Sequence, residues 1–92
     1  MAELPHHIEV MKDVFAQSVQ GKIVLLSMQT SHYYGLDEVG TRAWQLIAAG
    51  SDPRQLVKQL LAEFDVDEAT LQNDLARLIE DLAAAGLIAC TN

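Results

Sequence analysis

The stretch that decides the fold is residues 32–47, which read HYYGLDEVGTRAWQLI. Residues 32–36 are rich in aromatic side chains, which favour β-strands, and an amphipathic segment follows them. Asp37 stands at the junction, where its carboxylate makes it a good N-cap for a helix that begins with Glu38 and Val39. The stretch therefore predicts a strand that leads directly into a helix.

The residues before this junction also have the chemistry of β-strands. Residues 8–11 and 14–19 are short β-prone segments, and residues 23–28 are apolar at both odd and even positions. A strand with one solvated face alternates, so we expect 23–28 to be central in a sheet or covered on both faces. With a turn at Gly21 and Lys22, and with the aromatic segment, these runs predict a three-stranded antiparallel meander.

The residues after the junction predict three helices. The first ends at Gly50, a residue suited to the C′ position. The second starts at 51–53, with a proline in its first turn, and carries one broad apolar face as far as Phe64. Asp67 caps the last helix and Gly86 ends it, leaving a short apolar tail.

Strands followed by helices indicate an α+β fold in which one sheet packs against a helical layer. The last two helices are joined by a short turn and resemble a helix-turn-helix pair. The expected architecture is therefore winged-helix-like, a three-stranded antiparallel sheet followed by three helices. A chain of 92 residues without a repeat or linker predicts one domain, 1–92.

Composition disfavours several classes of function. The net charge is −7, with 13 Asp and Glu against 6 Lys and Arg, whereas nucleic-acid binding depends on basic side chains. A winged-helix DNA-binding protein is the more distant alternative, because residues 68–81 hold four carboxylates and one Arg. No apolar run reaches the roughly 20 residues of a membrane span, and no signal-peptide pattern opens the chain. We expect a cytoplasmic protein with neither a nucleic-acid nor a membrane partner.

No constellation of catalytic or metal-ligating residues stands out. His6 and His7 are adjacent on an extended chain, so their side chains point to opposite sides and chelate one metal poorly. His32 has no nucleophile near it in a recognisable motif, and Cys90 has neither a second thiol nor a basic neighbour. The sequence predicts no enzyme activity, no metal and no cofactor.

The aromatic strand has the features of an open sheet edge. Residues 32–36 contain no Lys, Pro or carboxylate, the residues that usually protect an edge from further pairing. If this strand lies at the edge, its free N–H and C=O groups can accept an added strand. Tyr33 and Tyr34 must point to opposite faces, so one packs inward and the other is available outside, or both are ordinary strand residues.

The last helix has the features of a groove wall. Its apolar stripe is mostly core and consists of Leu71, Leu75, Leu78 and Leu82. Asp74, Arg77 and Asp81 lie at i, i+3 and i+7 along one flank of that stripe. A polar flank beside apolar residues is what the wall of a groove would present.

The stretch 32–47 resembles the signature of PqqD-like proteins, which has an aromatic pair, then Leu-Asn, then a Gly and a Trp one helical stretch on. The small connector at Gly50 and the closing helix to Gly86 follow the family pattern too, and the resemblance covers almost the whole chain from about residue 8. Asp37 stands where Asn is common, and both residues cap a helix well.

PqqD-like domains are recognition elements for ribosomally made, post-translationally modified peptides, and they bind the leader of the precursor as an added strand. The resemblance implies that this leader lies between the third strand and the last helix. Residues that would contact it are His32, Tyr33, Tyr34, Gly35, Leu36, Leu71, Asp74, Leu75, Arg77, Leu78 and Asp81. The resemblance also indicates that Leu36 and Trp44 belong to the core.

The implied partners are a precursor leader peptide and a leader peptidase or other maturation enzyme. A free-standing chain of this size looks most like the leader-binding protein of lasso-peptide systems, which works with a separate leader-cleaving cysteine protease and a cyclase. The alternative is the protein of the PQQ pathway, which presents its peptide to a radical enzyme. The sequence leaves both open.

Overall fold

The computed structural model of the protein describes Pro5 and residues 7–91. His6, one of the two adjacent histidines, lies outside the described residues. Five strands and three helices are assigned within the described part. Their order is β1 (His7–Val10), β2 (Val14–Val19), β3 (Lys22–Ser27), β4 (Tyr33–Gly35), α1 (Glu38–Ala48), α2 (Pro53–Glu63), α3 (Glu68–Ala84) and β5 (Ile88–Thr91).

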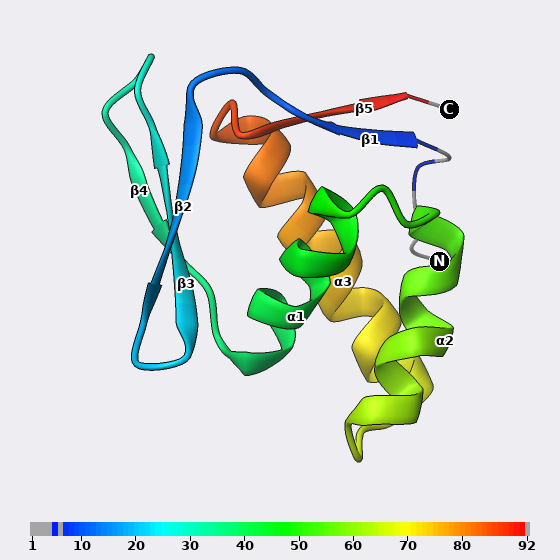
Figure 1. Ribbon diagram of the computed structural model, residues 1–92. Coiled ribbons are helices and arrows are strands. Elements are labelled where there is room, and N and C mark those ends of the chain that lie inside the picture. The colour runs from blue at the N-terminus through cyan, green and yellow to red at the C-terminus, as the bar shows by residue number, and fades with distance from the viewer. Residues whose placement is uncertain (1–4, 6, 92) are drawn as a thin grey trace.

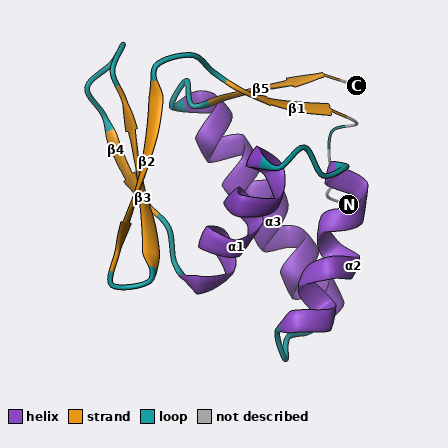
Figure 2. Cartoon of the chain, in the orientation of Figure 1, coloured by secondary structure: helices purple, strands orange, loops and turns teal. Residues whose placement is uncertain are grey.

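The strands form two separate antiparallel sheets (Figures 1 and 2). The larger sheet is the expected meander, with strand order β2-β3-β4, so the α+β prediction is confirmed. All three helices of the described chain lie on one side of this sheet (Figure 1). The smaller sheet pairs β1 with β5, and it brings the two ends of the chain together over the helical layer.

The helix caps predicted at Asp37 and Asp67 are confirmed, and Asp52 is a third cap that the sequence analysis did not name. Asp37 accepts a hydrogen bond from the Gly40 N–H at 2.7 Å, and Asp52 and Asp67 cap α2 and α3 through their side chains. α1 and α3 each end just before a glycine with a left-handed backbone, with φ of 88° at Gly50 and 77° at Gly86. This conformation costs a glycine little, which explains the position of both stops.

The strand bounds differ from the expected ones by a residue at some ends, and the turn before β3 and the segment after α3 differ in kind. The turn before β3 uses Gln20 and Gly21, both with positive φ, and Lys22 already belongs to the strand. Two such residues in succession give a turn whose twist matches that of the flanking strands. The apolar tail after α3 is the strand β5, which pairs Ile88 with Val10, a partner from the opposite end of the chain.

The central strand β3 is covered on one face only. Ile23 and Leu25 are buried against the helices, as a central strand requires. On the opposite face Val24 is only half-buried, and Met28 just beyond the strand is 57% exposed. Of the two alternatives for residues 23–28, the central position is right and full coverage is wrong.

Two adjoining clusters of buried side chains make up the core. The first packs the sheet against α1 and α3 and contains Ile23, Leu25, Leu36, Trp44, Ile79, Leu82, Leu87 and Ile88. The second joins the three helices and contains Ala43, Leu46, Ile47, Leu56, Leu60, Leu71 and Leu75. Leu36 and Trp44 are 5% and 4% exposed, so their assignment to the core is confirmed.

A buried hydrogen bond ties the sheet to α1. The Ile23 N–H donates to Thr41 Oγ1 at 2.9 Å, and Thr41 is 6% exposed. Ile23 also accepts a hydrogen bond from the Leu36 N–H at 2.9 Å. Both main-chain groups of one β3 residue therefore hold the segment that connects β4 to α1.

We expect Thr41→Val to lower the free energy of unfolding by about 1–3 kcal/mol, because it leaves the buried Ile23 N–H without a partner at nearly unchanged side-chain volume. Thr41→Ser keeps the hydroxyl, so it loses only the smaller contribution of one methyl group. Urea unfolding of the two variants checks this, and a Val variant as stable as the Ser variant would contradict it.

Candidate binding groove

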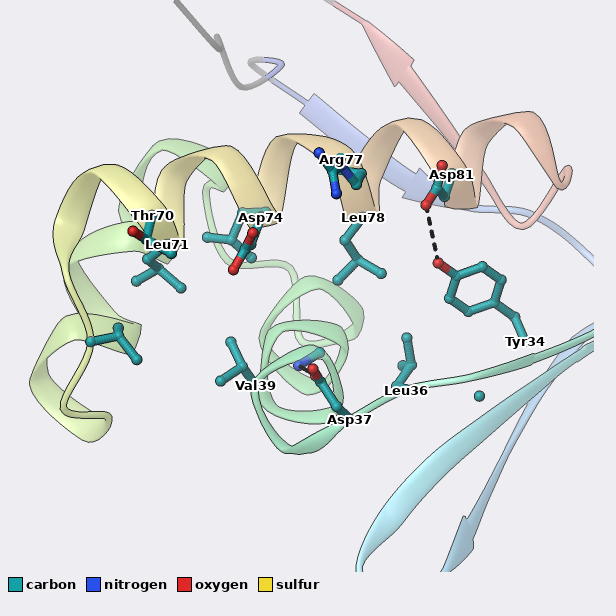
Figure 3. Close-up of a pocket in the computed structure, with 14 residues that line it drawn as sticks. Tyr34, Leu36, Asp37, Val39, Thr70, Leu71, Asp74, Arg77, Leu78 and Asp81 are labelled. Atoms are coloured by element: carbon teal, nitrogen blue, oxygen red, sulfur yellow. Dashed lines mark hydrogen bonds between the residues drawn. The ribbon is translucent and has the colours of Figure 1, made fainter.

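A groove lies between the end of β4, the first turn of α1 and one face of α3 (Figure 3). Its volume is about 470 Å³, within the range of about 300–1,000 Å³ that is typical of ligand sites. It is lined by Tyr34, Gly35, Leu36, Asp37, Val39, Gly40, Val66, Thr70, Leu71, Asp74, Leu75, Arg77, Leu78 and Asp81.

The structure brings nine of the eleven expected site residues to this groove. These are Tyr34, Gly35, Leu36, Leu71, Asp74, Leu75, Arg77, Leu78 and Asp81. Tyr33 and His32 do not line it. The Tyr33 side chain is 74% exposed on the opposite face of the sheet, and His32 precedes β4 and uses its C=O to accept from the Ser27 N–H.

Five residues that line the groove were not expected from the sequence. Thr70 lies one helical turn before Asp74 on the same flank of α3. Extending the predicted polar flank by four residues toward the N-terminus of the helix would have included it. Val39 and Gly40 lie in the first turn of α1, and Asp37 and Val66 precede α1 and α3. Their presence depends on how closely α1 approaches α3, which no local sequence pattern encodes.

The groove has an apolar floor and a charged rim. Leu36, Leu71 and Leu75 are each 5% exposed or less, so the floor belongs to the core. The exposed rim carries Asp74 and Arg77, and two more lining carboxylates stand at Asp37 and Asp81. Negative lining side chains outnumber positive ones, so the rim favours a ligand with cationic groups beside an apolar anchor.

One hydrogen bond crosses the groove at one end (Figure 3). The phenol of Tyr34 on β4 donates to Asp81 Oδ2 on α3 at 3.3 Å. Burial raises the pKa of Tyr34 above its ordinary value of 10.0, and the Asp81 carboxylate raises it further through its charge and the hydrogen bond, with a smaller contribution from Asp37. The phenol is therefore a protonated donor throughout the neutral range.

The outer edge of β4 presents free main-chain groups. On either side of the Leu25–Tyr34 pair, the Ser27 N–H donates to the His32 C=O and the Leu36 N–H donates to the Ile23 C=O. In an antiparallel ladder, hydrogen-bonded residue pairs alternate with pairs that are not hydrogen-bonded. The main chain of Tyr34 is therefore hydrogen-bonded to β3, and the main chains of its two neighbours are not. Tyr33 and Gly35 direct their N–H and C=O groups away from β3, where the described chain places no strand.

Comparison with known proteins identifies the family. The family model for coenzyme PQQ synthesis protein D (PqqD) matches residues 22–88, which include the meander's last two strands and all three helices. The chain belongs to the PqqD family. The resemblance read from residues 32–47 is thereby confirmed.

Two solved structures are similar to this PqqD-family chain. One is TbiB1 in complex with the TbiA(beta) leader peptide, which is 35% identical, with coverage of 87% of this chain and 93% of that one and a TM-score of 0.80. The other is lasso peptide synthetase B1 complexed with the leader peptide, 19% identical, with coverage of 90% and 98% and a TM-score of 0.80. The second likeness shows the fold alone. No curated protein sequence matches the chain significantly.

Two further observations concern the described residues of this PqqD-family protein. No three or more His, Cys, Asp and Glu side chains among them are grouped so that they could hold a metal ion. None of the described helices combines the length and apolar character that a membrane crossing requires.

We expect the Tyr34 phenol to titrate above pH 10.0 in a Tyr33→Phe variant, where it is the remaining one of two tyrosines. The pKa of Tyr34 is higher in the folded chain than in the unfolded chain. The protonated phenol therefore stabilises the fold fully below pH 10.0, and this stabilisation is lost as pH rises through the folded-state pKa. Adding Asp81→Asn should lower the midpoint toward 10.0 without reaching it, because burial remains.

The ultraviolet absorbance of tyrosinate follows this titration. A midpoint that does not move when Asp81 is replaced would contradict the contact between β4 and α3.

Proposed function

We propose that this protein binds the leader segment of a ribosomally synthesised precursor peptide as a strand added to β4, and presents the precursor to maturation enzymes. The preferred enzymes are a leader peptidase and a cyclase of the lasso-peptide type. The observation that carries the proposal is the position of the open β4 edge directly beside a groove whose other wall is α3. The proposal assigns binding and no catalytic step.

The two parts of the site supply different contributions to recognition. Tyr33 and Gly35 each offer one donor and one acceptor to the added strand, which gives affinity that does not depend on the leader's side chains. Side chains of a strand alternate between faces, so every second leader residue points to the groove side, the side of Tyr34. There the apolar floor suits an apolar leader side chain, and the carboxylates of the rim suit a neighbouring Lys or Arg.

The comparisons support the binding of a leader peptide. The chain that is 35% identical carries a leader peptide in its solved structure, and the similarity spans most of both chains. We place the protein in the cytoplasm, where ribosomal precursors are made, and propose residues 1–92 as a single recognition domain.

A second candidate is a peptide chaperone of PQQ biosynthesis that serves a radical SAM enzyme. The family description, coenzyme PQQ synthesis protein D, supports it. Both candidates use the same edge and groove, so titration with the two kinds of leader separates them. Saturable binding of a PQQ precursor and not of a lasso precursor leader would favour the second candidate.

Gly35 allows a direct test of the added strand. We expect Gly35→Pro to weaken leader binding by at least about tenfold, since proline removes an N–H from the open edge and leaves the bonds to β3 intact. Gly35→Ala is the matched control, because a Cβ at this position meets no atom within 4 Å and the N–H is kept. Fluorescence anisotropy with a labelled leader gives both affinities.

Circular dichroism and urea unfolding confirm that both variants are folded. Equal leader affinity of the folded Pro and Ala variants would refute strand addition at β4.

The α3 wall is tested by a pair of charge reversals on one helix. Asp74 lines the groove, whereas Glu80 is exposed on α3 and does not line it. We expect Asp74→Lys to weaken leader binding at least about tenfold more than Glu80→Lys, since only the first puts a long cationic side chain in the groove. The two variants have the same net charge. An equal loss of leader affinity in both would therefore come from the overall electrostatic field of the protein, and it would contradict a specific role of Asp74.

A further inference from the structure

Arg77 is the one cationic residue that lines the groove, and its side chain has no partner among the described residues. The sequence contains two other arginines, and both are paired with carboxylates. Arg42 contacts Glu63 at 2.8 Å, and Arg54 contacts Asp52 at 2.9 Å. Arg77 is exposed and makes no hydrogen bond or ion pair with any described residue, so its guanidinium is available to a ligand.

Two carboxylates of the same helix lie at pairing positions from Arg77 and are not bonded to it. Asp74 precedes it by three residues and Asp81 follows it by four, and side chains at these spacings are neighbours on a helix surface. Asp81 instead accepts the hydrogen bond from Tyr34 that crosses the groove. The three α3 side chains therefore line the groove in the order negative, positive, negative (Figure 3).

An available guanidinium beside an added strand favours a carboxylate on that strand. Its planar set of N–H donors matches the two oxygens of an Asp or Glu side chain, and such charge-assisted pairs are stronger than neutral hydrogen bonds. The net charge of −7 opposes an acidic ligand everywhere else on the protein. An acidic leader residue is therefore accepted where Arg77 offsets that field.

The spacing of charges along α3 restricts where this carboxylate can lie. A helix rises about 1.5 Å per residue, so along the axis Arg77 is about 4.5 Å from Asp74 and about 6 Å from Asp81. Side chains on one face of a strand repeat about every 6.8 Å. A leader with an acidic residue at Arg77 thus brings its residues two positions away toward the two aspartates, which accept cationic or neutral side chains and repel a second acidic one.

We propose that Arg77 determines specificity by binding one acidic side chain of the leader. This inference deepens the proposed function and rests on it. The class of leader that it defines has an Asp or Glu on the groove side, and the residues two positions before and after it carry no negative charge. Because a shift of the strand by two positions moves the acid toward an aspartate, the same contact fixes the register of the leader along β4.

The test is a double-mutant cycle between Arg77 and the leader of the precursor encoded nearest to this chain. Each Asp or Glu of the labelled leader is replaced in turn by Asn or Gln, and fluorescence anisotropy measures its affinity for the full parent chain and for Arg77→Met. Lys58→Met is the matched control, because it removes the same charge from an exposed residue of α2 that does not line the groove. Urea unfolding verifies the fold of each variant.

We expect Arg77→Met to weaken leader binding about fivefold, as for a well-aligned exposed ion pair. One leader substitution should weaken binding to the parent chain by the same factor, and combining the two should cause no further loss, because each removes the same contact. Lys58→Met should bind the leader within about twofold of the parent. Arg77→Glu should regain affinity for a leader in which the critical acid is replaced by Arg.

Leader binding without coupling between Arg77 and any acidic leader residue overturns this proposal and leaves the proposed function intact. An equal loss in Lys58→Met does the same, since the effect then comes from net charge. A leader that binds although its bound segment contains no Asp or Glu also overturns it. A folded parent chain that binds no leader refutes the proposed function itself, and the role of Arg77 falls with it.

Discussion

The rest of the structure depends on how the main-chain groups of Ile23 are paired. Its C=O accepts from the Leu36 N–H and its N–H donates to Thr41 Oγ1, so one residue of the central strand fixes both the end of β4 and the first turns of α1. With these bonds in place, Leu36 is buried and Asp37 caps the helix without an intervening loop. The groove follows from this short connection, because the first turn of α1 is held at the end of β4 and faces α3.

The alternation of a single short strand separates three surfaces. Tyr34 points to the groove and contacts Asp81, Tyr33 points to the opposite face of the sheet, and the main chain of Tyr33 and Gly35 points along the open edge. The surfaces also differ in charge, because carboxylates line the groove whereas β2, β3 and β4 contain none. A shift of one residue in the β3–β4 register would exchange the two tyrosines and disrupt all three surfaces at once.

Features encoded locally were predictable from the sequence, and features made by distant contacts were not. The capping residues Asp37 and Asp67 and the stop at Gly50 each act within one helical turn, so their positions could be read directly. The pairing of β1 with β5 joins opposite ends of the chain, and no short pattern specifies it. For the groove, the α3 stripe predicted most of one wall by periodicity, whereas Val39 enters it only through the packing of α1 on α3.

Amide hydrogen exchange of the chain with and without a leader peptide tests the central claim most directly. Strand addition predicts that the amides of Tyr33 and Gly35 exchange much more slowly in the complex, because they gain partners at the open edge. The Tyr34 amide, already bonded to β3, should change far less. Saturable leader binding that leaves Tyr33 and Gly35 as unprotected as in the free protein would contradict the account.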